Sequence, residues 1–376
     1  MSLGIAGMGW ITPLGGGLAS VWERLLAGES AKAETIHDLL GRTTYFAYRV
    51  PTSSLNDAPM YARLRRSSAI SQFAVGAGLE ALNNSGWKLD EINAKRLALI
   101  FAISNGGVIY TRRFYHDIVE SGAQTASPLL FPETVFNAPA SHLAAILGIT
   151  GASYTLVGDG AVGILALKMA EDLMEADTVD HCLVVGAEET DWLLCDAYRK
   201  WRLLRSAPPI EAFGTPARGM ILSEGAGAIL LSRKASIQID QVLSGGNFVR
   251  RKDSAAGLRK LFADFNGGGG AELVVASANG TFIDVAERTA ILECFPGALV
   301  YTPKPALGES VAAGSLWQVI CAAKALSCQQ LPPVLNAAEG NGVRINRRRL
   351  DKLKMRRALV SVCGLNQQFA GMKLSV

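Results

Sequence analysis

The chain has no long apolar run. Its 376 residues are 49% hydrophobic and only 19% charged, yet no stretch reaches the roughly 18 to 20 apolar residues that a membrane-spanning helix needs. The first residues, MSLGIAGMGW, contain neither the basic region nor the cleavage site of a secretory signal. We therefore expect a cytoplasmic protein without a membrane segment. Its length predicts one large domain or two fused domains around a sizeable core.

Paired cysteines and clustered histidines are also absent. No CxxC pair occurs, and the four histidines stand far apart without a second ligand at helical spacing. The six cysteines lie mostly within apolar runs, at Cys182, Cys195, Cys294, Cys321, Cys328 and Cys363. We expect reduced core thiols rather than disulfides, and neither a metal site nor a cofactor.

The most informative stretch is residues 154–169, YTLVGDGAVGILALKM, in which a strand pattern passes through three small residues into a helix pattern. Such an elbow is where an α/β enzyme mounts a nucleophile, because the free N–H groups and dipole of a helix N-terminus favour an anion. Here the first helical position is Gly160, which has no side chain, and Asp159 is a poor nucleophile without further arrangement. The sequence therefore predicts an elbow without a nucleophile.

The same pattern of segments occurs again in the second part of the chain. Residues 99–107, LIFAISNGG, are echoed at 273–281, LVVASANGT, and the elbow helix is echoed at 310–326. A glycine-rich segment near Glu224 has its echo at 358–370. Two copies of a β/α unit predict two sheets packed around shared helices, which explains why the elbow helix and its echo are rich in small and apolar residues.

Basic residues gather in two places. Residues 344–357, RINRRRLDKLKMRR, hold eight basic side chains and one acidic side chain, and a shorter segment at 62–66 reads ARLRR. A basic run is usually a solvated face, and the functional alternative is a docking patch for an acidic partner. Because no aromatic residues are interleaved, a nucleic acid is the weaker choice of partner, and we expect none.

Five segments along nearly the whole chain resemble the motifs of one family, in order and at similar intervals. They are GMGWITPLG near the start, LLFPETVFNAPASHLAAILGITG at 129–151, GAVGILALKMA at 160–170, LSEGAGAILL at 222–231 and KPALGE at 304–309. Together they resemble the β-ketoacyl-acyl-carrier-protein synthases, condensing enzymes of the thiolase superfamily. The resemblance implies an α/β chain with a thiolase-like five-layer α-β-α-β-α fold made of two repeated halves. We expect the halves to be residues 1–235, which contain the elbow, and residues 236–376.

That family condenses acyl units with an elbow cysteine that carries the acyl chain as a thioester, together with two histidines and a lysine. Carried over to this chain, the cysteine position falls on Gly160 and the first histidine on Asn279. The lysine is Lys304, and the second histidine falls on Glu309. Three of the four catalytic side chains are therefore replaced, and no intact catalytic residue set is expected.

Other family features are retained in part. Asp284 and Glu287 resemble the D-x-x-E motif after the first histidine loop, and residues 364–367 resemble the closing turn that helps to form the oxyanion site, with one glycine missing. We expect Lys304 and Glu309 to form an ion pair that holds the wall of the site without performing chemistry. A glutamate in place of a neutral imidazole adds negative charge where a carbanion would form, which opposes condensation.

The resemblance and the replaced residues lead to a first hypothesis of a chain-length-factor-like subunit. Such a subunit pairs with an active synthase in fatty acid or polyketide/polyene biosynthesis and has no condensing activity alone. The alternative is a residual acyltransferase, thioesterase or malonyl decarboxylase that uses Asn279, Lys304 and Glu309 in a new way. A third, weaker hypothesis is a homodimeric module that binds a carrier protein or an acyl chain.

The resemblance also implies partners. Members of the family are dimers across a large apolar interface, so we expect a heterodimer with an active synthase subunit, or a homodimer. Phe131 and Phe136 are expected at the acyl tunnel or the partner interface, where they limit chain length. The acidic acyl carrier protein is expected to dock on the basic side chains of Arg63, Arg65 and Arg66, or on the basic run at 347–357.

Overall fold

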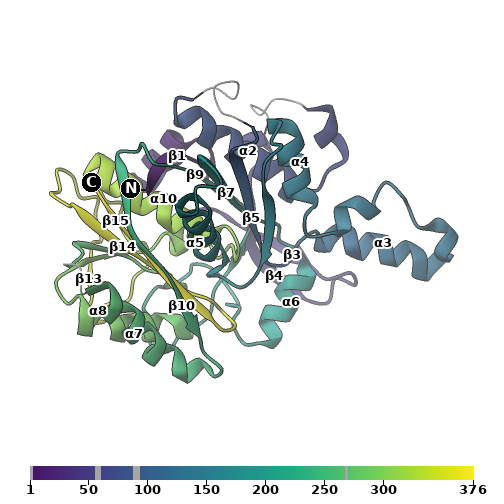
Figure 1. Cartoon of the computed structure of the whole chain (residues 1–376). Helices are drawn as coiled ribbons and strands as arrows, with labels where there is room; N and C mark the ends of the chain where they lie inside the picture. The colour runs from purple at the N-terminus through teal and green to yellow at the C-terminus, as the bar shows by residue number, and fades with distance from the viewer. Residues whose placement is uncertain (1–2, 56–60, 88–93, 267–269) are drawn as a thin grey trace.

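The computed structural model describes residues 3–55, 61–87, 94–266 and 270–376. Their strands form one hydrogen-bonded sheet of 12 strands and a separate sheet of three strands (Figure 1). The small sheet consists of β3 (Ala33–His37), β4 (Thr44–Tyr48) and β8 (Leu222–Ser223).

The large sheet contains the same five-strand arrangement twice. The first half runs in the order β1 (Leu3–Thr12), β9 (Gly225–Ser232), β7 (His181–Glu188), β5 (Leu97–Ile103) and β6 (Ser153–Val157). The second half runs in the order β10 (Ile237–Asn247), β15 (Gln368–Ser375), β14 (Arg357–Cys363), β11 (Leu273–Val275) and β12 (Leu299–Tyr301). In each half the first two pairings are antiparallel and the next two are parallel. The predicted repeat is therefore confirmed. Two short strands, β2 (Gly15–Gly16) and β13 (Arg344–Ile345), extend the halves.

Two details differ from the sequence-based expectation. Residues 3–5 of β1 pair with residues 237–239 of β10, so the two expected sheets are joined into one. The topological counterpart of β9 is β15, whereas the sequence pattern placed its echo from residue 358 onward, which is β14. Both strands are buried apolar runs, so periodicity alone does not tell them apart. The division at residues 235 and 236 falls between β9 and β10 and stays a prediction.

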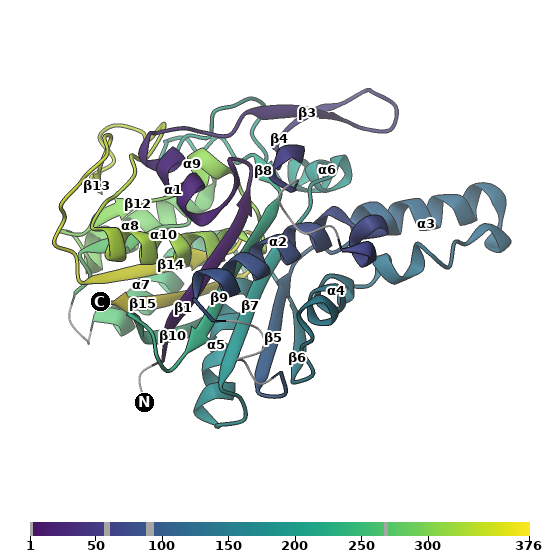
Figure 2. The same ribbon diagram turned by 90° about the horizontal axis from the view of Figure 1, so that it is seen from above.

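Two helices are enclosed between the half-sheets. The helix α5 (Val162–Glu175) contacts β5 and β7 on one side and β10 and β15 on the other, and α10 (Gly314–Cys328) likewise contacts strands of both halves. The outer helices α2 (Ala69–Asn84) and α4 (Ala138–Leu147) cover the first half. On the second half lies α7 (Ser254–Asn266), with α8 (Phe282–Cys294) packed beside it. This is the expected five-layer order, which Figures 1 and 2 show from two directions.

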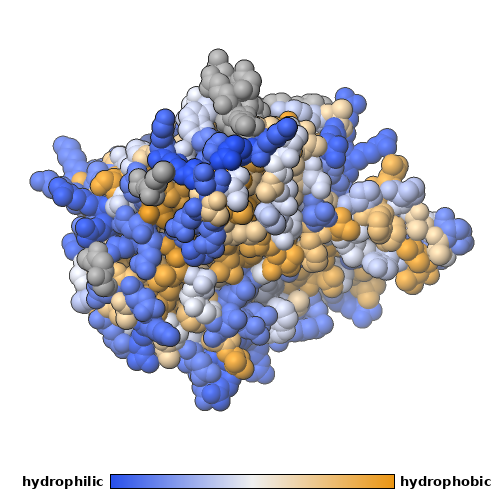
Figure 3. Space-filling model, in the orientation of Figure 1, coloured by the Kyte–Doolittle hydropathy of each residue, from blue (hydrophilic) through white to orange (hydrophobic). Residues whose placement is uncertain are grey.

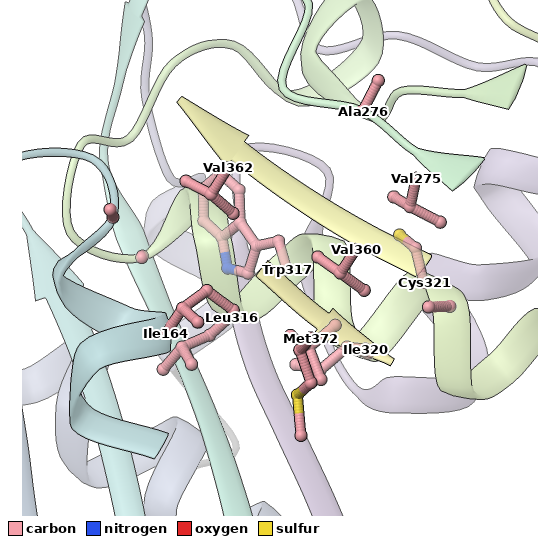
Figure 4. Close-up of a cluster of buried hydrophobic side chains, with 14 of the residues drawn as sticks. Ile164, Val275, Ala276, Leu316, Trp317, Ile320, Cys321, Val360, Val362 and Met372 are labelled. Atoms are coloured by element: carbon pink, nitrogen blue, oxygen red, sulfur yellow. The ribbon is translucent and has the colours of Figure 1, made fainter. Parts of the chain in front are cut away.

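The core is densest around α10. Twelve of its 15 residues are buried, because strands cover the helix on both sides. Trp317 donates its ring N–H to the carbonyl of Ala226 at 2.9 Å, which satisfies the only polar atom of that side chain. Figure 4 shows Ile164 of α5 and Leu316 of α10 pointing into the same cluster.

The remaining helices of the described residues are α1 (Leu18–Leu26), α3 (Val108–Ser121), α6 (Trp192–Lys200) and α9 (Lys304–Leu307). The same residues also form the 3-10 turns η1 (Thr52–Leu55), η2 (Ala62–Arg66), η4 (Ala123–Thr125), η5 (Phe131–Thr134) and η6 (Arg251–Asp253). Figures 1 and 2 show α3 projecting from the body. None of the helices described is long and apolar enough to cross a membrane.

Two glycines let β1 lie directly against α2. A Cβ built on Gly7 would stand 2.0 Å from the carbonyl oxygen of Ala81, and one built on Gly9 would stand 2.2 Å from that of Ala77.

We expect G9A to lower the free energy of unfolding by about 1–3 kcal/mol, because the backbone has to move. A Cβ on Gly297 meets nothing within 4 Å, so the control G297A should leave stability unchanged or raise it by up to about 1 kcal/mol. Denaturant unfolding tests this; equal values for the two variants would contradict the packing.

Candidate functional site

The predicted elbow is present, and its tip is covered. β6 ends at Val157 and α5 begins at Val162, so Gly160 lies in the turn between them and is buried. A Cβ built on Gly160 would stand 3.2 Å from the Cα of Gly364. The turn that follows β14 therefore lies directly over the position from which a nucleophile would project.

Asp159 holds that turn, and sequence reasoning did not assign it this role. Its carboxylate accepts the backbone N–H groups of Leu365 at 3.1 Å, Asn366 at 2.8 Å and Gln367 at 3.2 Å. Its own N–H donates to the side-chain carbonyl of Gln368 at 3.2 Å. The partners are more than 200 positions apart in the chain, so no local pattern signals the contact.

Asn279, Lys304 and Glu309 are brought together in the interior, each less than 5% exposed. Asn279 donates its side-chain N–H to Glu309 Oε2 at 2.6 Å, and the Lys304 ammonium pairs with Glu309 Oε1. The side-chain oxygen of Asn279 accepts from the hydroxyl of Thr281 at 2.7 Å. Both carboxylate oxygens of Glu309 and both the nitrogen and the oxygen of the Asn279 amide thus have a partner. The expected ion pair of Lys304 and Glu309 is present in the structure.

Backbone contacts fix Glu309 from a second side. Its N–H donates to the carbonyl of Ile221 at 2.9 Å, and its carbonyl accepts from Ser223 N–H at 2.8 Å. A Cβ on Gly314, the first residue of α10, would stand 3.0 Å from Lys304 Nζ. The ion pair therefore sits against the N-terminus of α10 and beside the short strand β8.

Asp284 and Glu287 project inward from the first turns of α8. Asp284 accepts the N–H groups of Phe213 at 2.6 Å and Asn279 at 2.8 Å, whereas Glu287 accepts both the N–H and the hydroxyl of Ser277. Burial raises the pKa of each carboxyl to about 7, against the opposing effect of these donors. They act as buried anchors for the loop that carries Asn279.

Tyr198 and Glu188 are further site residues that the sequence did not single out. Burial raises the pKa of Tyr198, and the negative charges of Glu188, Asp159 and Glu309 add to the rise, so this tyrosine of α6 lies within electrostatic reach of all three. Burial raises the pKa of Glu188 to about 8, although the backbone N–H of Asn105 donates to it. Glu188 is therefore mostly protonated at neutral pH.

Gly160 is connected to the loop that carries Asn279 through the turn that covers it. Gly364 covers it, and the neighbouring Cys363 donates its N–H to the Ser277 hydroxyl at 3.0 Å, two residues before Asn279. Chemically, the arrangement offers no free nucleophile at the elbow and no unpaired acid or base among Asn279, Lys304 and Glu309.

Phe131 and Phe136 belong to an arm formed by residues 108–137, which includes α3. Glu133 is the one side chain of this arm that is buried. Phe131 is 56% exposed and Phe136 is 45% exposed, and Figure 3 shows apolar residues gathered on the arm. Their expected place at a tunnel or interface stays a prediction.

Arg63, Arg65 and Arg66 lie on η2 and are exposed. The guanidinium of Arg63 donates to His142 Nδ1 at 3.1 Å, and His142 Nε2 contacts Glu133 at 2.5 Å. The basic turn is thus tied to the arm. The expected role of the three arginines in docking a carrier protein stays a prediction.

The basic run at 344–357 is partly structural. Arg347 donates to the carbonyls of Ala337 at 2.9 Å and Ala338 at 3.2 Å, and Arg349 pairs with Asp351 at 2.9 Å. Guanidinium groups that hold neighbouring loops account for part of this run, and its role as a docking patch stays a prediction.

Among the described residues, no group of three or more His, Cys, Asp or Glu side chains is placed to hold a metal ion. The six cysteines are free: Cys182, Cys195, Cys321 and Cys363 are buried, Cys294 is half-buried and Cys328 is exposed. Cys328 thus departs from the expectation of core thiols, because it ends α10 where the helix reaches the surface.

Comparison with known proteins identifies relatives of this chain. Residues 2–236 match the family model described as Beta-ketoacyl synthase, N-terminal domain. A 3-oxoacyl-[acyl-carrier-protein] synthase 2 of Vibrio cholerae serotype O1 is 26% identical over 372 residues, which cover 90% of each chain. Nodulation protein E of Rhizobium leguminosarum bv. trifolii is 28% identical over 233 residues, 60% of this chain and 57% of that protein.

Solved structures share the fold. The ishigamide ketosynthase/chain length factor matches with a TM-score of 0.86 at 21% identity, covering 100% of this chain and 99% of that one. A type II PKS acyl-carrier protein in complex with its ketosynthase, bound to the hexaketide, matches with a TM-score of 0.85 at 16% identity and the same coverage. At these identities the likeness concerns the fold alone.

The buried ion pair can be tested by removing one partner or both. K304M leaves the Glu309 charge buried without its cation, so we expect a loss of about 3–5 kcal/mol in the free energy of unfolding. The double variant K304M/E309Q removes both charges and keeps an acceptor for Asn279, so it should recover most of that loss. Denaturant unfolding of K304M, E309Q and the double variant gives the coupling free energy between Lys304 and Glu309. Simply additive losses would show that the two residues do not form a pair.

The raised pKa of Glu188 predicts a pH dependence of stability. Between its unfolded value of 4.5 and its folded value of about 8, the folded state holds a proton that the unfolded state has released. The contribution of Glu188 to the free energy of unfolding must therefore fall as pH rises, by up to about 1.4 kcal/mol per pH unit. E188Q removes this contribution, so from pH 5.5 to 7.5 its unfolding free energy should fall less steeply than that of the wild type. If the free energy of unfolding changed with pH equally in the wild type and in E188Q, the raised pKa of Glu188 would be refuted.

Proposed function

The chain belongs to the β-ketoacyl synthase family, and we propose that it is a catalytically degenerate member that serves as a chain-length-factor-like partner of an active ketosynthase. The pathway is fatty acid or polyketide biosynthesis. The observation that carries the proposal is Gly160 at the tip of the elbow. Backbone hydrogen cannot hold a thioester, and loss of a nucleophile typically removes several orders of magnitude in rate.

The interior of the site supports the same proposal. We assign Asn279 and Glu309 to the positions of the family's two histidines, and their side chains contact each other while Glu309 also pairs with Lys304. A general acid or base has to be within hydrogen-bond reach of its substrate and free to exchange a proton. A closed network of three buried groups is better suited to stabilising the fold than to turning over a carrier-bound thioester.

The surface supports a partner. β6 is the outermost strand of the first half, and within the described chain no strand pairs with its outer edge. Tyr154 is 42% exposed and Val157 is 54% exposed on this strand. An exposed apolar edge strand is a template for pairing with another chain, and contiguous apolar surface of this kind marks an interaction site.

The arm of residues 108–137 extends the same face. Besides Phe131 and Phe136, it exposes Leu129 and Val135, while α4, which follows the arm, packs on β5 and β6. A partner that covers β6 and the arm together would bury these aromatic rings, which are the residue type that most often carries binding energy. An active synthase of the same fold is the partner we propose, with a second copy of this chain as the alternative.

A carrier protein is the proposed second partner. Arg65 and Arg66 are exposed on η2 beside the arm, and the tie from Arg63 through His142 to Glu133 connects η2 to it. A carrier protein docked by charge should bind more weakly as salt rises, whereas the apolar synthase interface should persist at moderate salt.

The experiment is co-expression with an active ketosynthase encoded beside this chain, followed by size-exclusion chromatography with light scattering and product analysis. We expect a heterodimer, no β-ketoacyl product from this chain alone, and altered product length with F136A. V157K should weaken the heterodimer at least about tenfold, because it buries an unpaired charge. V249K is the matched control, since Val249 is 92% exposed on the other half.

Two outcomes contradict the proposal. Elution only as a monomer or homodimer, with no effect on the activity or product length of the synthase, removes the partner role. Turnover by the purified chain, lost in K304M or E309Q, favours instead a residual acyltransferase, thioesterase or malonyl decarboxylase.

A further inference from the structure

We infer that Asp159 is a positioning residue whose carboxylate occupies the N–H groups of residues 365–367 and keeps this turn closed over Gly160. The inference deepens the proposed function, on which it rests. It adds that the elbow is closed by a contact that would remain even if a nucleophile were restored.

The contact is unusually complete for a carboxylate at the surface. Three consecutive backbone N–H groups converge on Asp159 within 3.2 Å, in the manner of a backbone nest that binds an anion. Gly364 closes the same turn by donating its N–H to the Gln368 carbonyl at 2.7 Å. A Cβ on Gly364 would stand 2.0 Å from Asp159 Oδ2, so the carboxylate fits only because this residue is glycine.

The position of the nest gives the contact its consequence. The Cα of Gly364 lies 3.2 Å from where the Cβ of residue 160 would be, and the backbone nitrogen of Gly364 lies 4.0 Å from it, so the turn whose N–H groups bind Asp159 covers the elbow tip. Such donors stabilise a developing oxyanion only if they are free and preorganised. Here a resident carboxylate occupies them, and its negative charge opposes a second anion at the same place.

A thiol introduced at the elbow reports whether the turn is closed. In G160C, alkylation of the new thiol by iodoacetamide is followed by peptide mass spectrometry, and the exposed Cys328 of the same molecule is the internal reference. We expect the new thiol of G160C to react at least about tenfold more slowly than Cys328, because the carboxylate holds the turn with several charge-assisted hydrogen bonds. In D159A/G160C the rate should rise at least about tenfold.

Two controls separate closure from charge. Rates are compared on the high-pH plateau, where the introduced thiol is fully ionised, so that a shift of its pKa does not change the ratio. D264A/G160C removes an exposed aspartate of α7, and it should react like G160C.

A second measurement needs no introduced cysteine. Amide hydrogen exchange of the 364–368 segment should be at least about tenfold faster in D159A than in the wild type, with the segment of β14 unchanged. Unchanged exchange in D159A, or equal labelling of G160C and D159A/G160C, would overturn the inference. Both measurements use the purified full chain without a partner, so their failure is distinguishable from failure of the heterodimer assay.

Discussion

The enclosure of α5 and α10 between the two half-sheets is the constraint on which the rest of this structure depends. Strands cover both helices on two sides, so their residues have to be small or apolar along most of their length. The same enclosure determines where the helices begin. The N-terminus of α5 lies under the 364–367 turn, and the N-terminus of α10 lies against Lys304 and Glu309. The candidate site is therefore made by the packing of the two halves.

Inside that frame, polar groups are arranged to satisfy one another. Glu309 is shared by a lysine and an amide, Asp284 and Glu287 collect donors from adjacent loops, and Asp159 collects three N–H groups from the closing turn. Buried polar groups are costly when unpaired and stabilising when fully paired. At this site the carboxylates of Asp159, Asp284 and Glu309 all accept donors from the chain itself.

A separate feature of the molecule is the apolar surface exposed on its first half. The arm of residues 108–137 and the edge strand β6 expose apolar side chains and an open strand edge on one side of the first half, while the interior is densely packed. When another chain covers apolar surface beside an open strand edge, its burial lowers the free energy of the complex. The closed interior of the candidate site contrasts with this exposed apolar face of the first half.

The sequence by itself determined the internal repeat, the strand-to-helix elbow and the glycine at its tip, because these depend on local periodicity and on spacing along the chain. It also indicated the ion pair, since Lys304 and Glu309 are separated by one short turn. Only the tertiary structure decided that β1 and β10 join the sheets, and that Asp159 occupies the turn at 365–367. It also placed Tyr198 near three acids. The hydrogen bonds between Asp159 and the N–H groups of this turn join residues up to 208 positions apart, and no local pattern encodes which distant N–H groups a carboxylate will meet once the halves pack.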